Sequence, residues 1–93
     1  MFIYDVKTCK WKINELKNSP SARSSHSATV KDNKMYMFGG KDFENNKLKD
    51  FWVFDFIKNE WSEIEYTHSA EWPISRSGHS TGIFKNYVII PLI

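Results

Sequence analysis

A pattern that occurs twice is the feature that most restricts how this chain of 93 residues can fold. Pro20–Ser27 and Pro73–Ser80 both follow Pro-x-x-Arg-x-x-His-Ser, with equivalent positions 53 residues apart. The segments Phe2–Trp11 and Trp52–Trp61 share an aromatic–Asp pair and a tryptophan at one spacing, with an offset of 50 residues. Two matches in the same order predict a tandem repeat of about 50 residues, with a three-residue insertion before the second arginine motif.

Within each repeat, short apolar runs rich in aromatic residues alternate with polar turns. Met35–Phe38 and Phe51–Phe54 are typical of strands covered on both faces, and no stretch of ten residues has convincing helical periodicity. Polar segments at 31–34 and near Asn59 predict the turns of two hairpins, since Asn tolerates positive φ. The predicted strands lie near 25–30, 35–39, 50–56 and 60–65, preceded by strands at 2–6 and 10–16 and followed by strands at 78–84 and 87–92.

A double glycine, Gly39–Gly40, ends the second of these four strands, where missing Cβ atoms allow a tight exit or a close backbone approach. Phe54 and Trp61 are separated by six residues, as are Tyr4 and Trp11. With the arginine motifs, this combination resembles the kelch repeat over essentially the whole chain. The residues that carry the resemblance are Arg23, His26, Gly39, Gly40, Phe54, Asp55, Trp61, Arg76, His79, Tyr4, Asp5 and Trp11. It implies an all-β fold of four-stranded antiparallel kelch-type propeller blades around a central channel.

The strand order predicts about two blades in one kelch-repeat region, 1–93. Residues 1–17 would form the third and fourth strands of one blade, 23–66 a complete blade, and 76–93 the first and second strands of the next. Leu92–Ile93 stand where the repeat would place a second glycine pair. Because propellers typically have four to eight blades, we expect a partial, open propeller. It would be a fragment of a longer propeller, which we favour, a truncated gene product, or a subunit that closes by association through its open blade edges.

Composition and charge exclude several classes of protein. The net charge of +2 lacks the strong basic excess of a nucleic-acid-binding protein. The longest apolar run, 87–93, is far shorter than the roughly 20 residues of a membrane helix. A single cysteine, Cys9, excludes an internal disulfide and fits a reducing compartment. We therefore expect a cytoplasmic chain that binds neither nucleic acid nor membranes.

Candidate catalytic residues have structural interpretations. His26 and His79 occupy equivalent repeat positions, and the serine beside each points to the opposite face of a strand, so we expect no catalytic residue, metal ligand or cofactor. Arg23 and Arg76 would recognise a carboxylate or phosphate, or satisfy backbone carbonyls between blades.

The resemblance implies a protein–protein interaction module, an adaptor or scaffold. We expect no enzyme activity within these 93 residues. The module's longer connections, 17–22, 41–49 and 67–75, would emerge on one face and bind another protein. The candidate partner-binding residues are Lys41, Asp42, Phe43, Glu44, Glu71 and Trp72. In the opposing interpretation, Phe43 and Trp72 fold back onto their own blades. Two alternatives are a fragment of a propeller enzyme, of oxidase or sugar epimerase type, with its site outside this chain, and a ligand- or glycan-binding assembly of identical subunits.

Overall fold

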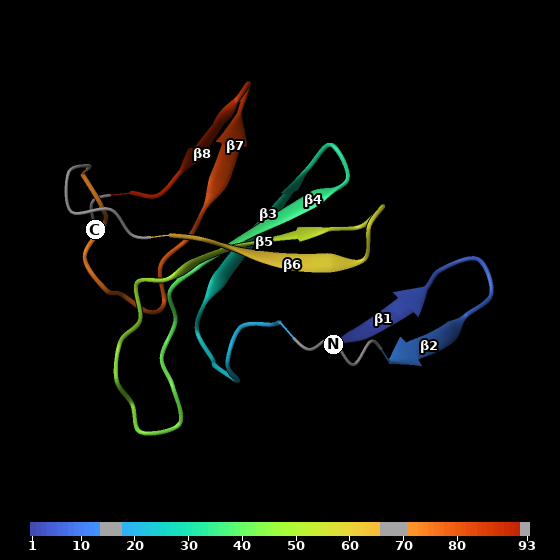
Figure 1. Cartoon of the computed structure of the whole chain (residues 1–93), viewed down its shortest axis with the longest axis horizontal. Coiled ribbons are helices and arrows are strands. Elements are labelled where there is room, and N and C mark those ends of the chain that lie inside the picture. The colour runs from blue at the N-terminus through green and yellow to red at the C-terminus, as the bar shows by residue number, and fades with distance from the viewer. Residues whose placement is uncertain (14–17, 66–70, 92–93) are drawn as a thin grey trace.

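The computed structural model describes residues 1–13, 18–65 and 71–91, and every regular element in these ranges is a β-strand. The strands are β1 (Phe2–Asp5), β2 (Lys10–Ile13), β3 (Ser27–Lys31), β4 (Lys34–Phe38), β5 (Phe51–Asp55), β6 (Glu60–Ile64), β7 (Gly82–Phe84) and β8 (Tyr87–Ile89). They form three antiparallel sheets, in the orders β1-β2, β3-β4-β5-β6 and β7-β8 (Figure 1). The predicted fold class is confirmed: one four-stranded sheet with the meander order of a propeller blade, flanked by two hairpins.

Tight turns with left-handed backbone connect the strands of the central sheet. Asp32 and Asn33, with φ of 50° and 65°, link β3 to β4 in a two-residue loop of the kind that requires positive φ at both positions. Between β5 and β6, the Asp55 carboxylate accepts hydrogen bonds from the Ile57 and Lys58 backbone N–H groups, at 2.9 and 3.1 Å. Short polar residues at these points fix the register of the sheet locally.

Two strands begin later than the sequence predicts. β3 begins at Ser27 rather than at residue 25, because Ser25 has a φ of 56° and Ser24 pairs instead with Lys41. β7 begins at Gly82 rather than at residue 78, and Gly78 has a φ of 69°. Some predictions fall outside the described residues. They are the predicted strand ends at 14–16 and 92, residues 67–70 of the last long connection, and the Leu92–Ile93 pair.

The hydrophobic core lies on one face of the central sheet. Cross-strand pairs Met35–Phe54, Met37–Trp52 and Phe54–Trp61 put their side chains on this face. The rings of Phe54 and Trp61 are 5.1 Å apart, and those of Trp52 and Trp61 meet edge to face at 6.3 Å. Aromatic pairs of this geometry add to the stabilisation that burial itself provides.

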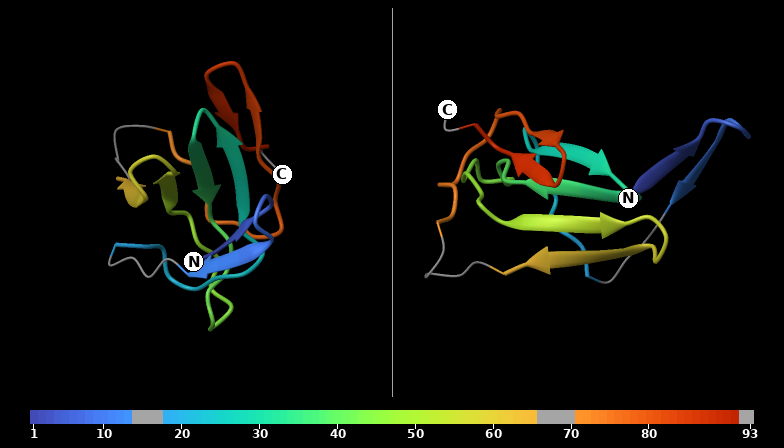
Figure 2. Two further views of the ribbon diagram at one scale, coloured as in Figure 1. Left: turned by 90° about the vertical axis from the view of Figure 1, so that its right-hand side faces the viewer. Right: turned by 90° about the horizontal axis from the view of Figure 1, so that it is seen from above.

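The opposite face of the central sheet meets the β7–β8 hairpin. Figure 2 shows β7–β8 beside the β3–β4 side of the sheet, and β3 is in contact with β7. Phe38 is fully buried on this face and packs edge to face against His79, with ring centroids 5.7 Å apart. Strands β3 and β7, the first strands of two successive repeats, are thus neighbours, as in adjacent blades of a propeller.

Candidate partner-binding surface

The double glycine joins the two repeats at the base of the long 41–49 loop. A Cβ on Gly39 would lie 2.7 Å from the Arg76 carbonyl oxygen, and one on Gly40 would lie 2.8 Å from the Ser24 carbonyl oxygen. The backbone N–H of Gly40 donates to the Arg76 carbonyl at 2.9 Å. Only residues without a side chain fit here, because backbone from both repeats closes around the pair.

An ion pair fixes the other end of this loop. The Arg23 guanidinium donates from Nη1 and Nη2 to the two carboxylate oxygens of Asp50, at 2.5 and 2.8 Å, and from Nη1 to the Gly39 carbonyl at 3.1 Å. The Trp52 indole N–H donates to the same carboxylate at 2.7 Å. Burial raises the pKa of Asp50, but the hydrogen bonds from Arg23 and Trp52 outweigh it and hold that pKa below its usual value. The carboxylate that Arg23 binds therefore belongs to its own blade.

Between these anchors the 41–49 loop forms a narrow ribbon. Its two sides are joined by the Leu48 N–H, which donates to the Gly40 carbonyl at 2.8 Å, and by the Asp42 N–H, which donates to the Asn46 carbonyl at 3.0 Å. The Asp42 carboxylate accepts from the Glu44 and Asn46 backbone N–H groups at 3.0 and 2.9 Å. These hydrogen bonds, chiefly the one from Asn46, hold the pKa of Asp42 below its usual value. The loop has a defined conformation up to its tip.

Phe43 stands at that tip, and it does not fold back onto the blade. Its side chain is 99% exposed, the highest value among the exposed large apolar residues of the described chain. Glu44 follows it and is also exposed, while Lys41 at the base is half-buried and pairs with Ser24 and Lys47.

Trp72, in contrast, does fold back. Its indole N–H donates to the Lys49 carbonyl at 2.7 Å, and its ring meets Phe51 edge to face at 6.5 Å. Trp72 and Glu71 line an open, mainly apolar groove of about 360 Å³ whose other walls are Tyr36, Phe38, Phe51, Pro73, Val88 and Ile90. The groove lies between the central sheet and β8.

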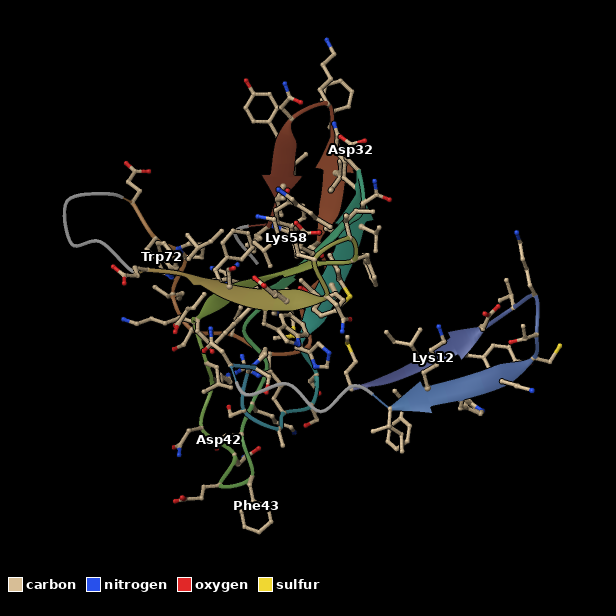
Figure 3. All side chains as sticks on the ribbon, turned by 45° about the vertical axis from the view of Figure 1, so that its right-hand side comes forward. Lys12, Asp32, Asp42, Phe43, Lys58 and Trp72 are labelled. Carbon is tan, nitrogen blue, oxygen red and sulfur yellow. The ribbon has the colours of Figure 1, made fainter. Side chains whose placement is uncertain are left out.

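The six residues predicted to bind a partner therefore form two groups. Lys41, Asp42, Phe43 and Glu44 belong to the ribbon, and Glu71 and Trp72 belong to the groove. Figure 3 shows Asp42 and Phe43 at the end of the ribbon and Trp72 apart from them, beside the sheet.

The two motif histidines have different surroundings. His79 is half-buried against Phe38, and this burial is the main cause that lowers its pKa, whereas His26 is exposed. Cys9 is an exposed free thiol. In the ranges 1–13, 18–65 and 71–91, no group of three or more His, Cys, Asp or Glu side chains is placed to hold a metal ion, and no helix is long and apolar enough to cross a membrane.

The sequence analysis did not single out Asp50, although it anchors the loop. Its equivalents, 50 residues earlier and 53 residues later, fall before Met1 and after Ile93, so the repeat comparison offers no second copy. The available signal was its position directly before the aromatic strand β5, in reach of the motif arginine Arg23.

Comparisons with known proteins agree with this architecture. The family model of the KLHDC2/KLHL20/DRC7 Kelch-repeats domain matches residues 1–91. This chain belongs to the Kelch-repeat family. Kelch-like protein 25 of Xenopus tropicalis is 35% identical over 88 residues, which are 95% of this chain and 14% of that protein. Ras guanine nucleotide exchange factor F of Dictyostelium discoideum is 31% identical over 91 residues, 97% of this chain and 8% of that protein.

The chain therefore spans a small part of the curated relatives that it matches. A shorter match, 38% identical over 55 residues, is to the tRNA wybutosine-synthesizing protein 2/3/4 of Oryza sativa subsp. japonica, and covers 57% of this chain and 5% of that protein. Family membership and the Kelch-like relatives support a protein-interaction module in general.

Proposed function

We propose that this Kelch-repeat chain acts as an adaptor or scaffold that binds another protein chiefly through the ribbon at 41–49. The observation that carries the proposal is the exposure of Phe43, 99%, at the end of a loop held by the hydrogen bonds of Asp42 and anchored by Arg23–Asp50. A fully exposed phenyl ring gives a large favourable free energy when it moves from water into an apolar pocket of a partner, and aromatic side chains supply many binding hot spots.

The fixed ribbon favours binding because little conformational entropy is lost when its tip is covered. Glu44 and Asp42 place negative charge beside the ring. We therefore expect a partner with an apolar pocket that is bordered by basic or N–H donor groups. Trp72 would contribute less, because its indole N–H is already bonded to Lys49.

Photo-crosslinking tests this directly. A photoreactive phenylalanine replaces Phe43 in the complete protein, and a matched one replaces Ile57, which is also exposed but lies in the β5–β6 turn. We expect a crosslinked protein from position 43 and none from position 57. Phe43→Ala should then lower affinity for that purified protein about 30-fold or more with an unchanged melting temperature, since hot spots cost roughly 2 kcal/mol or more when truncated. Equal affinity of Phe43→Ala and the unmodified chain would overturn the proposal.

A second candidate is a propeller region of a larger enzyme whose catalytic residues lie elsewhere, which the match to the rice tRNA wybutosine-synthesizing protein favours. The sequence of the complete reading frame distinguishes the two, because a fused catalytic segment would favour the enzyme. We also propose a cytoplasmic location, supported by the single cysteine, which fluorescence microscopy of the tagged complete protein would check.

A further inference from the structure

The two hairpins at the ends of the chain expose large apolar side chains, and those on β1–β2 are equivalent to residues that the central sheet buries. Phe2, Tyr4 and Trp11 on β1–β2, and Tyr87 and Ile89 on β8, are all exposed. Among the described strands, β1 pairs only with β2 and β8 only with β7, so β1 and β8 are both open edge strands. One hairpin corresponds to the second half of a blade and the other to the first half.

The central sheet supplies the register in which these edges would pair. In it, Met35 of β4 lies opposite Phe54 of β5, and Met37 lies opposite Trp52. Adding the repeat offset of 53 to a residue number in β4 gives its equivalent in β8, and subtracting the offset of 50 from a residue number in β5 gives its equivalent in β1. The equivalent pairs in a joined blade are Val88–Tyr4, Ile89–Ile3 and Ile90–Phe2. Every one of these pairs is apolar, as cross-strand pairs in a buried sheet should be.

The open groove beside β8 is where the added side chains would go. Val88 and Ile90, the equivalents of core residues Met35 and Met37, line this groove together with Tyr36 and Phe51 of the central sheet. Alternate residues of a strand point to the same face of a sheet, so residues 2 and 4 of an added β1 would share the face of Val88 and Ile90. Phe2 and Tyr4 of the added strand would therefore enter the groove, whose volume is about 360 Å³.

We propose that a second copy of this chain adds its β1 strand antiparallel to β8, so that β7–β8 of one copy and β1–β2 of the next form a complete four-stranded blade. The contact is head-to-tail: the copy that uses its β8 keeps a free β1, and the copy that uses its β1 keeps a free β8, so further copies can be added. Each copy contributes two blades, and closed rings of four to eight blades would need about two to four copies. This contact uses a surface separate from the ribbon at 41–49 and does not depend on the proposed function.

Disulfide trapping tests both the contact and its register. Two variants of the 93-residue chain are prepared in a Cys9→Ser background, one with Tyr4→Cys and one with Val88→Cys. Opposite residues of antiparallel strands have Cα atoms about 4.5–5.5 Å apart, which suits a disulfide. On mixing under mild oxidation, we expect a 4–88 disulfide in most of the protein. A mixture of Ile3→Cys with Val88→Cys is the control, because residue 3 points to the opposite face, and we expect at least tenfold less disulfide.

Sedimentation of the unmodified chain is the second measurement, and it decides the matter even where a cysteine variant loses its strand structure. We expect the mean mass to rise with concentration from one chain towards two to four, and Phe43→Ala to sediment in the same way. A mass of one chain at all concentrations up to about 0.5 mM, 3–88 disulfides as abundant as 4–88, or disulfides only between identical positions would each overturn the proposal.

Discussion

The β1–β2 and β5–β6 hairpins are two versions of one structure in different surroundings. Their registers match, with Tyr4 opposite Trp11 and Phe54 opposite Trp61. Their turns match as well: Cys9 N–H donates to the Asp5 carbonyl at 2.8 Å, as Asn59 N–H does to the Asp55 carbonyl at 2.7 Å. The repeated sequence therefore builds the same hairpin twice through local interactions.

Burial separates the two hairpins. Trp61 is 8% exposed and Phe54 is 1% exposed, while Trp11 is 67% exposed and Tyr4 is 43% exposed. The difference arises because β5 continues the sheet through β4 and β3, whereas β1 has no further strand beside it among the described residues. The comparison teaches that the motif specifies a hairpin, but that neighbouring strands provide its stability.

The largest expected effect is a difference between equivalent tryptophans. Trp61→Ala should lower the free energy of unfolding by about 3–5 kcal/mol, since it removes a buried aromatic residue and leaves a cavity. Trp11→Ala should lower it by less than about 1 kcal/mol, because an exposed side chain loses little on truncation. Urea denaturation followed by circular dichroism, at a concentration where the chain is monomeric, measures both. Equal losses would show that the burial difference has no energetic meaning.

A second comparison separates backbone conformation from close packing. Gly39 and Gly78 have nearly the same φ, 68° and 69°, but an added Cβ would contact the Arg76 carbonyl only at Gly39, and nothing lies within 4 Å of it at Gly78. Gly78→Ala should cost about 1 kcal/mol for its left-handed backbone. Gly39→Ala should cost about 2–4 kcal/mol, since overpacking adds about 1–3 kcal/mol. The denaturation midpoints give both values, and a cost at Gly39 no greater than at Gly78 would contradict the contact between the repeats.

Acid should weaken the central sheet through Asp50. Its pKa is lowered in the folded chain, so ionised Asp50 stabilises the fold above the ordinary aspartate pKa of about 3.9, and this stabilisation is lost as the pH falls through the lowered folded value. Asp50→Asn should cost about 1–2 kcal/mol at neutral pH, as expected for a partly exposed, charge-assisted hydrogen bond.

The stability of the Asp50→Asn variant should depend less on pH below about 4 than that of the unmodified chain. Asp5→Asn is the matched control, because its pKa is also lowered, chiefly by the Lys7 N–H, but it lies in the exposed hairpin. Urea titrations at several pH values measure this. Identical pH dependence of the Asp50→Asn variant and the unmodified chain would show that the Arg23–Asp50 pair does not stabilise the fold.

The smallest effect concerns the β1–β2 turn. Cys9 has a φ of 57° where its equivalent Asn59 has 58°, and Asn adopts this left-handed conformation more readily. Cys9→Asn should stabilise the hairpin by about 0.5 kcal/mol. The backbone chemical shifts of β1 and β2 should then move towards the values that are typical of β-strands. Unchanged shifts would indicate that the turn does not limit the stability of this hairpin.

The strand order, hairpin turns and four-stranded sheet could be predicted from the sequence because each depends on local patterns: alternating apolar runs, Asp–Asn turns and a repeat that occurs twice. Trp72 could not be placed, because its hydrogen bond to the Lys49 carbonyl depends on how a connection returns to the sheet. Asp50 was missed because its role comes from Arg23, 27 residues away in sequence. Contacts between distant segments decide which predicted residues share a surface.

Hydrogen exchange of backbone amides tests the central claim most directly, that equivalent hairpins differ in stability chiefly because of the strands beside them. In a dilute, monomeric sample we expect slow exchange in β4 and β5 and exchange near the unprotected rate in β1 and β2. Raising the concentration should then slow exchange in β1 and β8 at least tenfold, with little change in β4 and β5. Protection of β1–β2 equal to that of β5–β6 in the monomer, or no concentration dependence at β1 and β8, would contradict the account.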